Sequence, residues 1–402
     1  MAKTVCLVGT LDTKGMEFEF VKERVEASGV GTYSINTGIL GEPHFTPDIS
    51  ANEVATAAGT SLQALRDEGD RGNSVAMMAN GAAAIVEKRY SEGKIDGIIS
   101  LGGSAGTTIG TTAMRAVPVG VPKVMVSTLA SGDTSPYVDT KDIAMMYSVV
   151  DIAGINSVSR QILANAAGAI AGMVQVEVPA VDDKPLIGAT MFGVTTPCVT
   201  KAREALEDAG YEVLVFHATG TGGRAMEDLV KGGFIVGVLD VTTTELADEL
   251  VGGVLSAGPD RLEAAGDLAV PQVVAPGALD MVNFGPPDTV PEQFSERQFY
   301  QHNPTVTLMR TTVEENAELG KIMARKLSQA KGPTTVIIPQ HGVSAIDAAE
   351  QPFNSPEART AWIENLKANI GDNVTVIPMD CHINDDEFAT KLAETLLECL
   401  KD

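Results

Sequence analysis

A glycine-rich turn in the first half of the chain carries backbone groups that could bind an anion. Residues 98–110 predict a short buried strand, a tight turn and a helix of small residues, and the turn consists of Gly102, Gly103, Ser104, Ala105 and Gly106. Glycines let backbone N–H groups approach a ligand closely, and a helix N-terminus favours negative charge. The spacing matches neither the P-loop nor the dinucleotide G-x-G-x-x-G pattern, so close strand–helix packing explains this stretch equally well when it is taken alone.

Two further polar turns are expected at the same edge of a sheet as this glycine-rich turn. Asp12, Thr13 and Lys14 follow the first apolar strand of the chain, and Thr37 follows the second. In an open parallel sheet, ligands bind beyond the carboxyl ends of the strands. The three turns together therefore predict a phosphate-binding site.

Three of the five histidines follow predicted strands in the second half of the chain. His217, His341 and His382 each come just after the carboxyl end of an apolar run, which predicts one shared functional cleft. An imidazole could serve there as a general acid or base near pH 7, or could bind a metal. The sequence has no H-E-x-x-H or C-x-x-C pair, so acid–base use is favoured over metal binding. Metal ligands would have to come from separate loops, and the candidates are these histidines with Asp240, Asp280, Asp380 or Asp385.

Other residues of the second half are weaker candidates for chemistry. Arg224 opens a predicted helix beside two glycines, where it could clamp a carboxylate or phosphate. A salt bridge to one of the many surface acids explains Arg224 equally well. Ser344 and Cys198 are poor candidates for a nucleophile, because residues 342–345 lack the final glycine of the G-x-S-x-G elbow and most buried cysteines are inert.

These turns must be positioned by strands and helices that alternate along both halves of the chain. The alternation predicts an α/β fold with two Rossmann-like domains, each an open, mostly parallel sheet covered by helices. The expected domains are residues 1–179 and 185–402, joined by a charged, proline-containing linker. Residues 41–72 contain prolines and many polar side chains, and we expect them to form an irregular surface excursion.

Composition excludes several classes of function. The formal charge of −24 argues against binding to nucleic acid or to an anionic membrane surface. No run of about 20 apolar residues predicts a membrane span. The four cysteines lack close-pair spacing, and the N-terminus enters a strand without the apolar run of a signal peptide. We therefore expect a cytoplasmic protein that binds a small molecule.

Several motifs of the chain are similar to those of a known family. They read T-L-D-T-K-G at residues 10–15, G-G-S-A-G at 102–106, F-H-A-T-G-T-G-G-R at 216–224, P-G-A-L-D-M-V-N at 276–283 and H-I-N-D at 382–385, with a further match at 239–253. Across essentially the whole chain the sequence resembles the uncharacterised-protein family of Tm-one-like ATP-binding proteins, related to the tomato mosaic virus resistance protein. Antiviral activity is not expected to transfer from that relative.

The resemblance has consequences for the fold and the first-domain site. It implies two Rossmann-like domains, ATP bound in the first, and a homodimer. It also implies that the nucleotide site contains Asp12, Thr13, Lys14, Thr37, Gly102, Gly103, Ser104 and Ala105. Family members usually carry Asp-Pro-Glu-Ala-Asp where this chain has residues 355–359, which puts an acid–base role for that segment in doubt.

Three functions are consistent with these expectations. The first is an ATP-binding enzyme that acts on an unidentified small molecule in the interdomain or second-domain cleft. In it Lys14 neutralises phosphate charge, residues 102–105 donate N–H groups and Asp12 could hold Mg²⁺. The second is a regulatory or interaction protein that binds the nucleotide without turnover. The third is a small-molecule hydrolase or lyase that uses the three histidines and keeps a structural nucleotide site.

Overall fold

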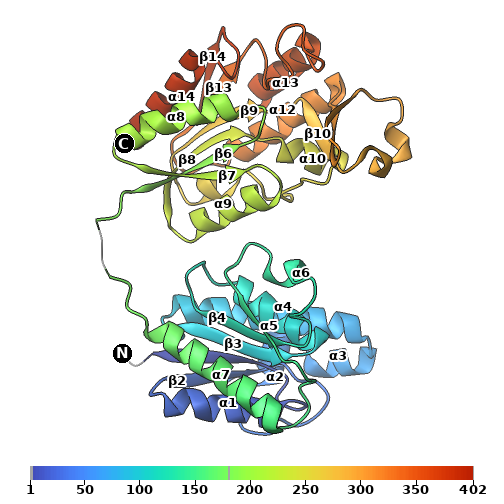
Figure 1. Ribbon diagram of the computed structural model, residues 1–402, viewed down its shortest axis with the longest axis vertical. Helices are drawn as coiled ribbons and strands as arrows, with labels where there is room; N and C mark the ends of the chain where they lie inside the picture. Colours follow the sequence, from blue (N-terminus) through green and yellow to red (C-terminus); the bar gives the residue numbers. More distant parts are fainter. Residues whose placement is uncertain (1–2, 180–181, 402) are drawn as a thin grey trace. The chain divides into compact units, whose positions relative to one another are not determined.

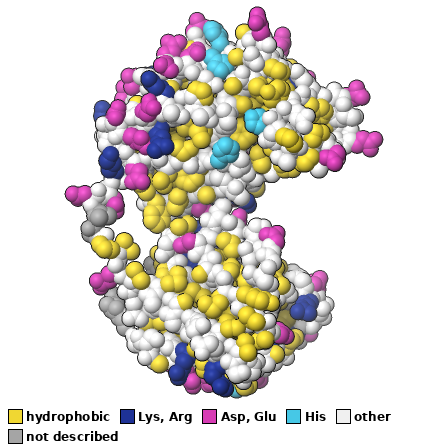
Figure 2. Space-filling view, in the orientation of Figure 1, with side chains coloured by type: hydrophobic (Ala, Val, Ile, Leu, Met, Phe, Trp, Pro, Cys, Tyr) yellow, Lys and Arg dark blue, Asp and Glu magenta, His cyan; other side chains and the backbone are white. Residues whose placement is uncertain are grey.

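Two compact units make up the chain. The computed structural model describes residues 3–179 and 182–401, which form the first and the second unit respectively (Figure 1). Each unit is α/β, with a mostly parallel sheet covered by helices, so the predicted fold class is confirmed. Acidic side chains are spread over the surface in Figure 2, in keeping with the net charge of −24. No helix within the described residues is long and apolar enough to span a membrane.

The first unit contains a five-stranded sheet in which all neighbouring strands run parallel. Its strands, in order across the sheet, are β2 (Gly31–Asn36), β1 (Thr4–Gly9), β3 (Gly97–Gly102), β4 (Lys123–Ser127) and β5 (Ala144–Tyr147). Successive side chains point to opposite faces, so Val5 and Leu7 contact one helical layer while Cys6 and Val8 contact the other. Burial on both faces explains the unbroken apolar runs of the central strands.

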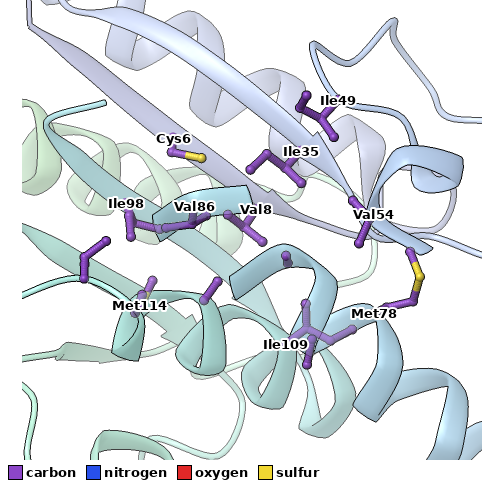
Figure 3. Close-up of a cluster of buried hydrophobic side chains, with 14 of the residues drawn as sticks. Cys6, Val8, Ile35, Ile49, Val54, Met78, Val86, Ile98, Ile109 and Met114 are labelled. Atoms are coloured by element: carbon purple, nitrogen blue, oxygen red, sulfur yellow. The ribbon is translucent and has the colours of Figure 1, made fainter. Parts of the chain in front are cut away.

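Helices cover both faces of this sheet. One layer holds α1 (Gly15–Ala27) and α7 (Ser157–Gln175), and the other holds α2 (Ala51–Ala57), α3 (Leu62–Glu68), α4 (Arg71–Ser91) and α5 (Ser104–Arg115), with the short α6 (Ser135–Val138) between β4 and β5. Figure 3 shows part of the core beneath the second layer, where Val8, Val54, Met78 and Ile109 gather. Strands β1 and β3 are adjacent, but the helices that follow them, α1 and α5, pack on opposite faces.

The expectation of an irregular surface excursion at residues 41–72 is wrong. The segment contains α2 and α3 and the start of α4, and Val54 and Leu65 lie in the core. Ser50 and Glu53 form a capping box at the start of α2, and Asp70 caps α4. These caps were readable from the sequence as S-x-x-E and as Asp before a helical pattern. The prolines that suggested irregular structure all precede the helices.

The second unit contains a larger parallel sheet. Its six strands, in order, are β14 (Val374–Met379), β13 (Thr334–Pro339), β9 (Gln272–Gly277), β8 (Ile235–Thr242), β6 (Leu186–Met191) and β7 (Glu212–His217). On one face lie α8 (Thr196–Asp208) and α14 (Asp386–Cys399), and on the other lie α9 (Thr221–Lys231), α10 (Glu245–Val251), α11 (Ala264–Asp267), α12 (Val313–Leu327) and α13 (Pro356–Asn369). Here too the helices that follow neighbouring strands, α8 after β6 and α10 after β8, take opposite faces.

A small antiparallel sheet distinguishes the second unit from the first. It consists of β10 (Met281–Phe284), β12 (Val306–Arg310) and β11 (Phe299–Asn303), in that order. The strand predicted near residues 305–309 exists, but it belongs to this separate sheet. Four residues of β11, Phe299 to Gln301 and Asn303, pair with it, although the alternation in this segment is too short to predict a strand.

Candidate functional site

A cavity of about 670 Å³ lies in the first unit, where β1, β2 and β3 end. Its lining includes all eight residues that were assigned to a nucleotide site, namely Asp12, Thr13, Lys14, Thr37, Gly102, Gly103, Ser104 and Ala105. Because α1 and α5 leave adjacent strands for opposite faces, the cavity lies at the topological switch point of the sheet, where open α/β folds bind ligands. The fold thus brings the three predicted turns together.

The N-terminus of α5 opens into this cavity. The first backbone hydrogen bond of the helix runs from the N–H of Thr107 to the carbonyl of Gly103. The N–H groups of residues 104–106 therefore have no partner in the helix. Among the residues that the structure describes, no side chain caps this end, and its first turn contains no acidic residue. A Cβ at Gly102 would lie 2.7 Å from the Cα of Gly106, so this tight turn requires glycine. The arrangement can hold an anion.

Three cationic side chains also line the cavity. Lys14 is the N-cap residue of α1, and its ammonium donates a hydrogen bond to the carbonyl of Ile152. Arg66 donates from Nε to the carbonyl of Ile39 at 2.5 Å, and Arg71 begins α4. These carbonyls are neutral, so they do not cancel the charges of Lys14 and Arg66. An ammonium has three protons to donate, which leaves Lys14 further capacity.

Two buried polar atoms in the lining have no hydrogen-bond partner within residues 3–179 and 182–401. They are Oδ1 of Asp12 and Oγ1 of Thr37, the latter on a side chain that is 2% exposed. The other oxygen of Asp12 accepts hydrogen bonds from the N–H groups of Leu40 and Gly41, at 2.8 and 3.1 Å. Buried polar groups are nearly always satisfied in folded proteins, so this pair suits contact with a polar ligand.

Four apolar side chains also line the cavity, forming an apolar wall that was missed from the sequence. Leu65 of α3, Val75 and Met78 of α4, and Ile109 of α5 line it. Three of these residues come from the helices that follow β2, in or just after the segment that seemed irregular. The caps at Ser50 and Asp70 could have revealed those helices, but not that they turn these side chains toward the glycine-rich turn.

The predicted cleft of three histidines does not form as one site. His217 ends β7 at one edge of the six-stranded sheet, whereas His341 and His382 follow β13 and β14 at the other edge. Four strand spacings of about 4.8 Å separate β7 from β13, which is roughly 19 Å. His341 and His382 do lie on neighbouring loops, because the N–H of His341 donates to the carbonyl of Cys381.

The two neighbouring histidines differ in their surroundings. His341 is exposed, and its Nε2 lies 2.9 Å from Oδ1 of the exposed Asp380. His382 has both ring nitrogens engaged: Nδ1 accepts from the N–H of Asn384 at 3.1 Å, and Nε2 lies 3.0 Å from the carbonyl of Ser344. This pattern fixes the tautomer with the proton on Nε2. His341 is therefore the better placed of the two for proton transfer.

The glycine-rich turn that carries Arg224 binds a carboxylate from its own chain. At the N-terminus of α9, the N–H groups of Gly220 and Gly223 donate to Oε1 of Glu245 at 2.7 and 3.1 Å. A Cβ at Gly223 would lie 2.1 Å from Oε2 of Glu245, so glycine is required for this approach. Arg224 lies half-buried in the first turns of α9. An external anion would have to displace the internal one, so the clamp role of Arg224 stays a prediction.

A buried ion cluster holds Glu245 in that position. Arg261, fully buried, donates from Nε to Glu245 at 2.6 Å and from Nη1 and Nη2 to Asp240 at 2.5 and 2.7 Å. Nη1 also lies 3.5 Å from Glu227. Burial would lower the pKa of Arg261, but Asp240 and Glu245 hold that pKa well above its usual value. Asp240, proposed above as a metal ligand, is thus committed to Arg261.

Asp280 is a buried acid near the loop of His382, to which it is linked through Ser344. The hydroxyl of Ser344 donates to Oδ2 of Asp280 at 2.7 Å, so Ser344, already a poor candidate for a nucleophile, is fully buried and engaged. Burial, with Asp347 adding to it and Arg310 opposing it, raises the pKa of Asp280 to about 7. Neither residue can meet a substrate in this arrangement.

The described residues include one group of three side chains with the spacing of metal ligands, Cys381, Asp385 and Glu387. Their donor atoms lie within 4.8 Å of one another. Burial raises the pKa of Cys381 to about 11, and a thiol must lose its proton to bind a metal. Cys198 is also an unsuitable nucleophile, because burial raises its pKa well above the usual range.

Comparison with known sequences identifies the family. The chain matches the N-terminal domain of the Uncharacterised protein family (UPF0261) over residues 3–179 and the C-terminal domain over residues 184–400. The chain belongs to this family. The predicted resemblance is therefore confirmed, and the two matched ranges coincide closely with the two compact units.

Proteins similar to this chain occur in bacteria and in a plant. A UPF0261 protein of Clostridium tetani is 57% identical over 100% of both chains. The tomato mosaic virus resistance protein Tm-1 of Solanum lycopersicum is 42% identical over 98% of this chain, but only 55% of the plant protein is covered. Among solved structures, a UDP-N-acetylglucosamine 2-epimerase from Rickettsia bellii aligns over 68% of this chain and 78% of its own, with 11% identity and a TM-score of 0.22, too low to support an argument.

The Arg261 cluster yields a stability prediction. Replacing Arg261 by Met leaves Asp240 and Glu245 buried without a countercharge, and we expect a loss of about 3–5 kcal/mol in the free energy of unfolding of the second unit. Arg203→Met is the matched control, because Arg203 pairs with Glu207 on the surface of α8. That change should cost less than about 1 kcal/mol. Urea unfolding followed by the fluorescence of Trp362, the single tryptophan, measures both, and equal losses would contradict the assigned role of Arg261.

The raised pKa of Asp280 predicts a pH dependence. The folded state prefers the protonated carboxyl, so this group's contribution to stability is complete below about pH 4 and is lost as pH rises through about 7. Between pH 5.5 and pH 8 the second unit should lose about 2 kcal/mol from this residue. The loss should shrink in Asp280→Asn but not in Asp288→Asn, which removes an exposed charge. Urea midpoints at the two pH values, read from Trp362 fluorescence, test this; an unchanged loss in Asp280→Asn contradicts it.

Proposed function

We propose that the first unit binds ATP in the cavity at the ends of β1, β2 and β3, and that the chain is an enzyme that uses this nucleotide on a small molecule. The observation that carries the proposal is the uncapped N-terminus of α5, which opens into a cavity with an apolar wall. A volume of about 670 Å³ falls within the range of ordinary ligand sites.

The phosphates would lie against the turn at residues 102–106. Free N–H groups at a helix N-terminus and the partial positive charge of the helix both favour phosphate. Lys14 could exchange its bond to the carbonyl of Ile152 for one to a phosphate oxygen, a stronger, charge-assisted bond. Arg66 and Arg71 add positive charge to the same lining.

The nucleoside would lie against the apolar wall. Leu65, Val75 and Met78 offer a surface on which a planar base can bury its faces. The unpartnered atoms of Asp12 and Thr37 supply an acceptor and a hydroxyl for polar groups of the nucleotide or for a bound cation. A phosphate ion alone would leave this wall unused, which is why we propose a whole nucleotide.

Mg²⁺ fits this cavity only as a companion of the phosphates. Among the described residues, no group of three metal-binding side chains lies in the lining. Mg²⁺ commonly takes one or two carboxylates together with phosphate oxygens and water, and Oδ1 of Asp12 could be one such ligand. The ion would neutralise charge on the phosphates.

The family resemblance supports ATP among nucleotides, and it also implies a homodimer. These inferences, together with the cytoplasmic location, form part of the proposal. For the reaction itself, His341 is the favoured acid–base residue, because it is exposed and lies beside a carboxylate at the carboxyl edge of its sheet.

Nucleotide binding is the direct test. We expect ATP to bind the wild-type chain in calorimetry, with Lys14→Ala at least about 10-fold weaker, since one charge-assisted contact is worth about 1.5–3 kcal/mol. Gly103→Val should abolish binding while preserving the fold, because a Cβ at Gly103 meets its first neighbour, Oγ1 of Thr128, at 3.7 Å. Lys22→Ala, on the outer surface of α1, is the matched control and should bind like wild type. Wild-type chain that binds no nucleotide would overturn the proposal.

Turnover tests the catalytic part. We expect ATP to be consumed in the presence of one member of a metabolite panel, and Gly103→Val to abolish product formation. Nucleotide binding without product formation from any member of the panel would favour the regulatory alternative. A metabolite consumed without ATP, and no longer consumed by His341→Ala, would favour the histidine-based alternative.

A further inference from the structure

A small cavity lies inside the second unit, at the ends of β9 and β13. Its accessible volume is about 10 Å³, and its lining includes Pro276, Pro339, Asp280, Arg359 and Trp362. About 10–15 Å³ is the least that can hold a water molecule. The cavity is thus too small for an organic ligand but large enough for a single water.

Three residues of the lining each have one buried polar atom without a hydrogen-bond partner within the described ranges. These atoms are Oδ1 of Asp280, Nε of Arg359 and Nε1 of Trp362. Other polar atoms of Asp280 and Arg359 are engaged: Oδ2 of Asp280 accepts from Ser344, and Nη1 of Arg359 lies 2.7 Å from Oδ1 of Asp347. A fold that buries three unpaired polar atoms around one cavity would lose stability at each of them.

We propose that this cavity binds one water molecule, which donates a hydrogen bond to Asp280 and accepts hydrogen bonds from Arg359 and Trp362. The three atoms match the capacity of water. Ionised Asp280 offers an acceptor, whereas Arg359 and Trp362 offer one N–H each, and water has two protons to give and two lone pairs to fill. Buried waters typically make about three hydrogen bonds to such groups.

Other small occupants match the cavity less well. A metal cation would meet the N–H groups of Arg359 and Trp362 and the nearby positive charge of Arg310, which also lines the cavity. Chloride would accept from the same two N–H groups, but it would face the carboxylate of Asp280, and it is larger than water. The neighbouring charges are Asp347, Arg310 and Arg359 beside Asp280, so the carboxylate is accompanied by two cations and one further acid.

The single tryptophan makes the proposal directly testable. With ¹⁵N-labelled tryptophan, Trp362 gives the only indole N–H resonance of the chain. At pH 8, in chloride-free buffer, we expect this proton to show a cross-relaxation peak to a water of long residence, with the sign of a bound molecule rather than of exchange. A crystal structure at about 1.5 Å should show one water within hydrogen-bond distance of all three atoms.

A cavity-filling variant supplies the control. Val343 lines the cavity, and Val343→Leu should displace the water, so that the water peak of Trp362 is lost and the thermal midpoint of the second unit falls. Val313→Leu makes the same change at an exposed position of α12 and should preserve the peak. No water peak in the folded wild-type chain, density for chloride, or a peak unchanged in folded Val343→Leu would overturn the proposal.

Discussion

The reversal of strand order beside the first strand of each parallel sheet is the structural constraint from which the candidate site follows. In the first unit β1 and β3 are adjacent, but α1 and α5 leave them for opposite faces of the sheet. No helix can then close over the gap between the two strand ends, so a crevice must open there. The turns at residues 10–14 and 102–106 line it because they are the connections on either side of that gap.

The second unit has the same reversal between β6 and β8, and there side chains of the chain itself bond to one another and to helix ends. The hydroxyls of Thr195 and Thr242 lie 2.8 Å apart across it. Oδ1 of Asn384 accepts from the N–H of Cys198 at the start of α8, and Glu245 accepts from the N-terminus of α9. The N-termini of α8 and α9 thus each have an internal partner. The N-terminus of α5 has no side-chain cap among the described residues, and this difference from α8 and α9 supports the proposal of a ligand site in the first unit.

The sequence predicts this fold well where the structure of a segment depends on residues that are close together along the chain. Strands buried on both faces appear as apolar runs, and their polar ends mark the crevice, so the eight residues of the candidate site could be named in advance. Its apolar wall could not, because Leu65 and Met78 reach the cavity through tertiary packing of α3 and α4. The prediction of one cleft shared by three histidines was wrong for a related reason. The sequence shows that each histidine follows a strand, but it does not show the order of the strands across the sheet. That order separates His217 from His341.

The acidity of the chain does not prevent anion binding at this crevice. Charges beyond about 8 Å are largely screened at physiological ionic strength, so the net charge of −24 matters less than the lining itself. There, three cations meet three carboxylates, those of Asp12, Asp70 and Asp151. Each carboxylate accepts a hydrogen bond from a backbone N–H, and within the described residues Lys14 and Arg66 each donate to a neutral carbonyl. Neutral partners leave charges of both signs in place, so the cations and carboxylates of the lining nearly balance, and the partial positive charge at the end of α5 favours an anion. A triphosphate carries more charge than these groups can balance, so the proposed complex requires a cation beside Asp12.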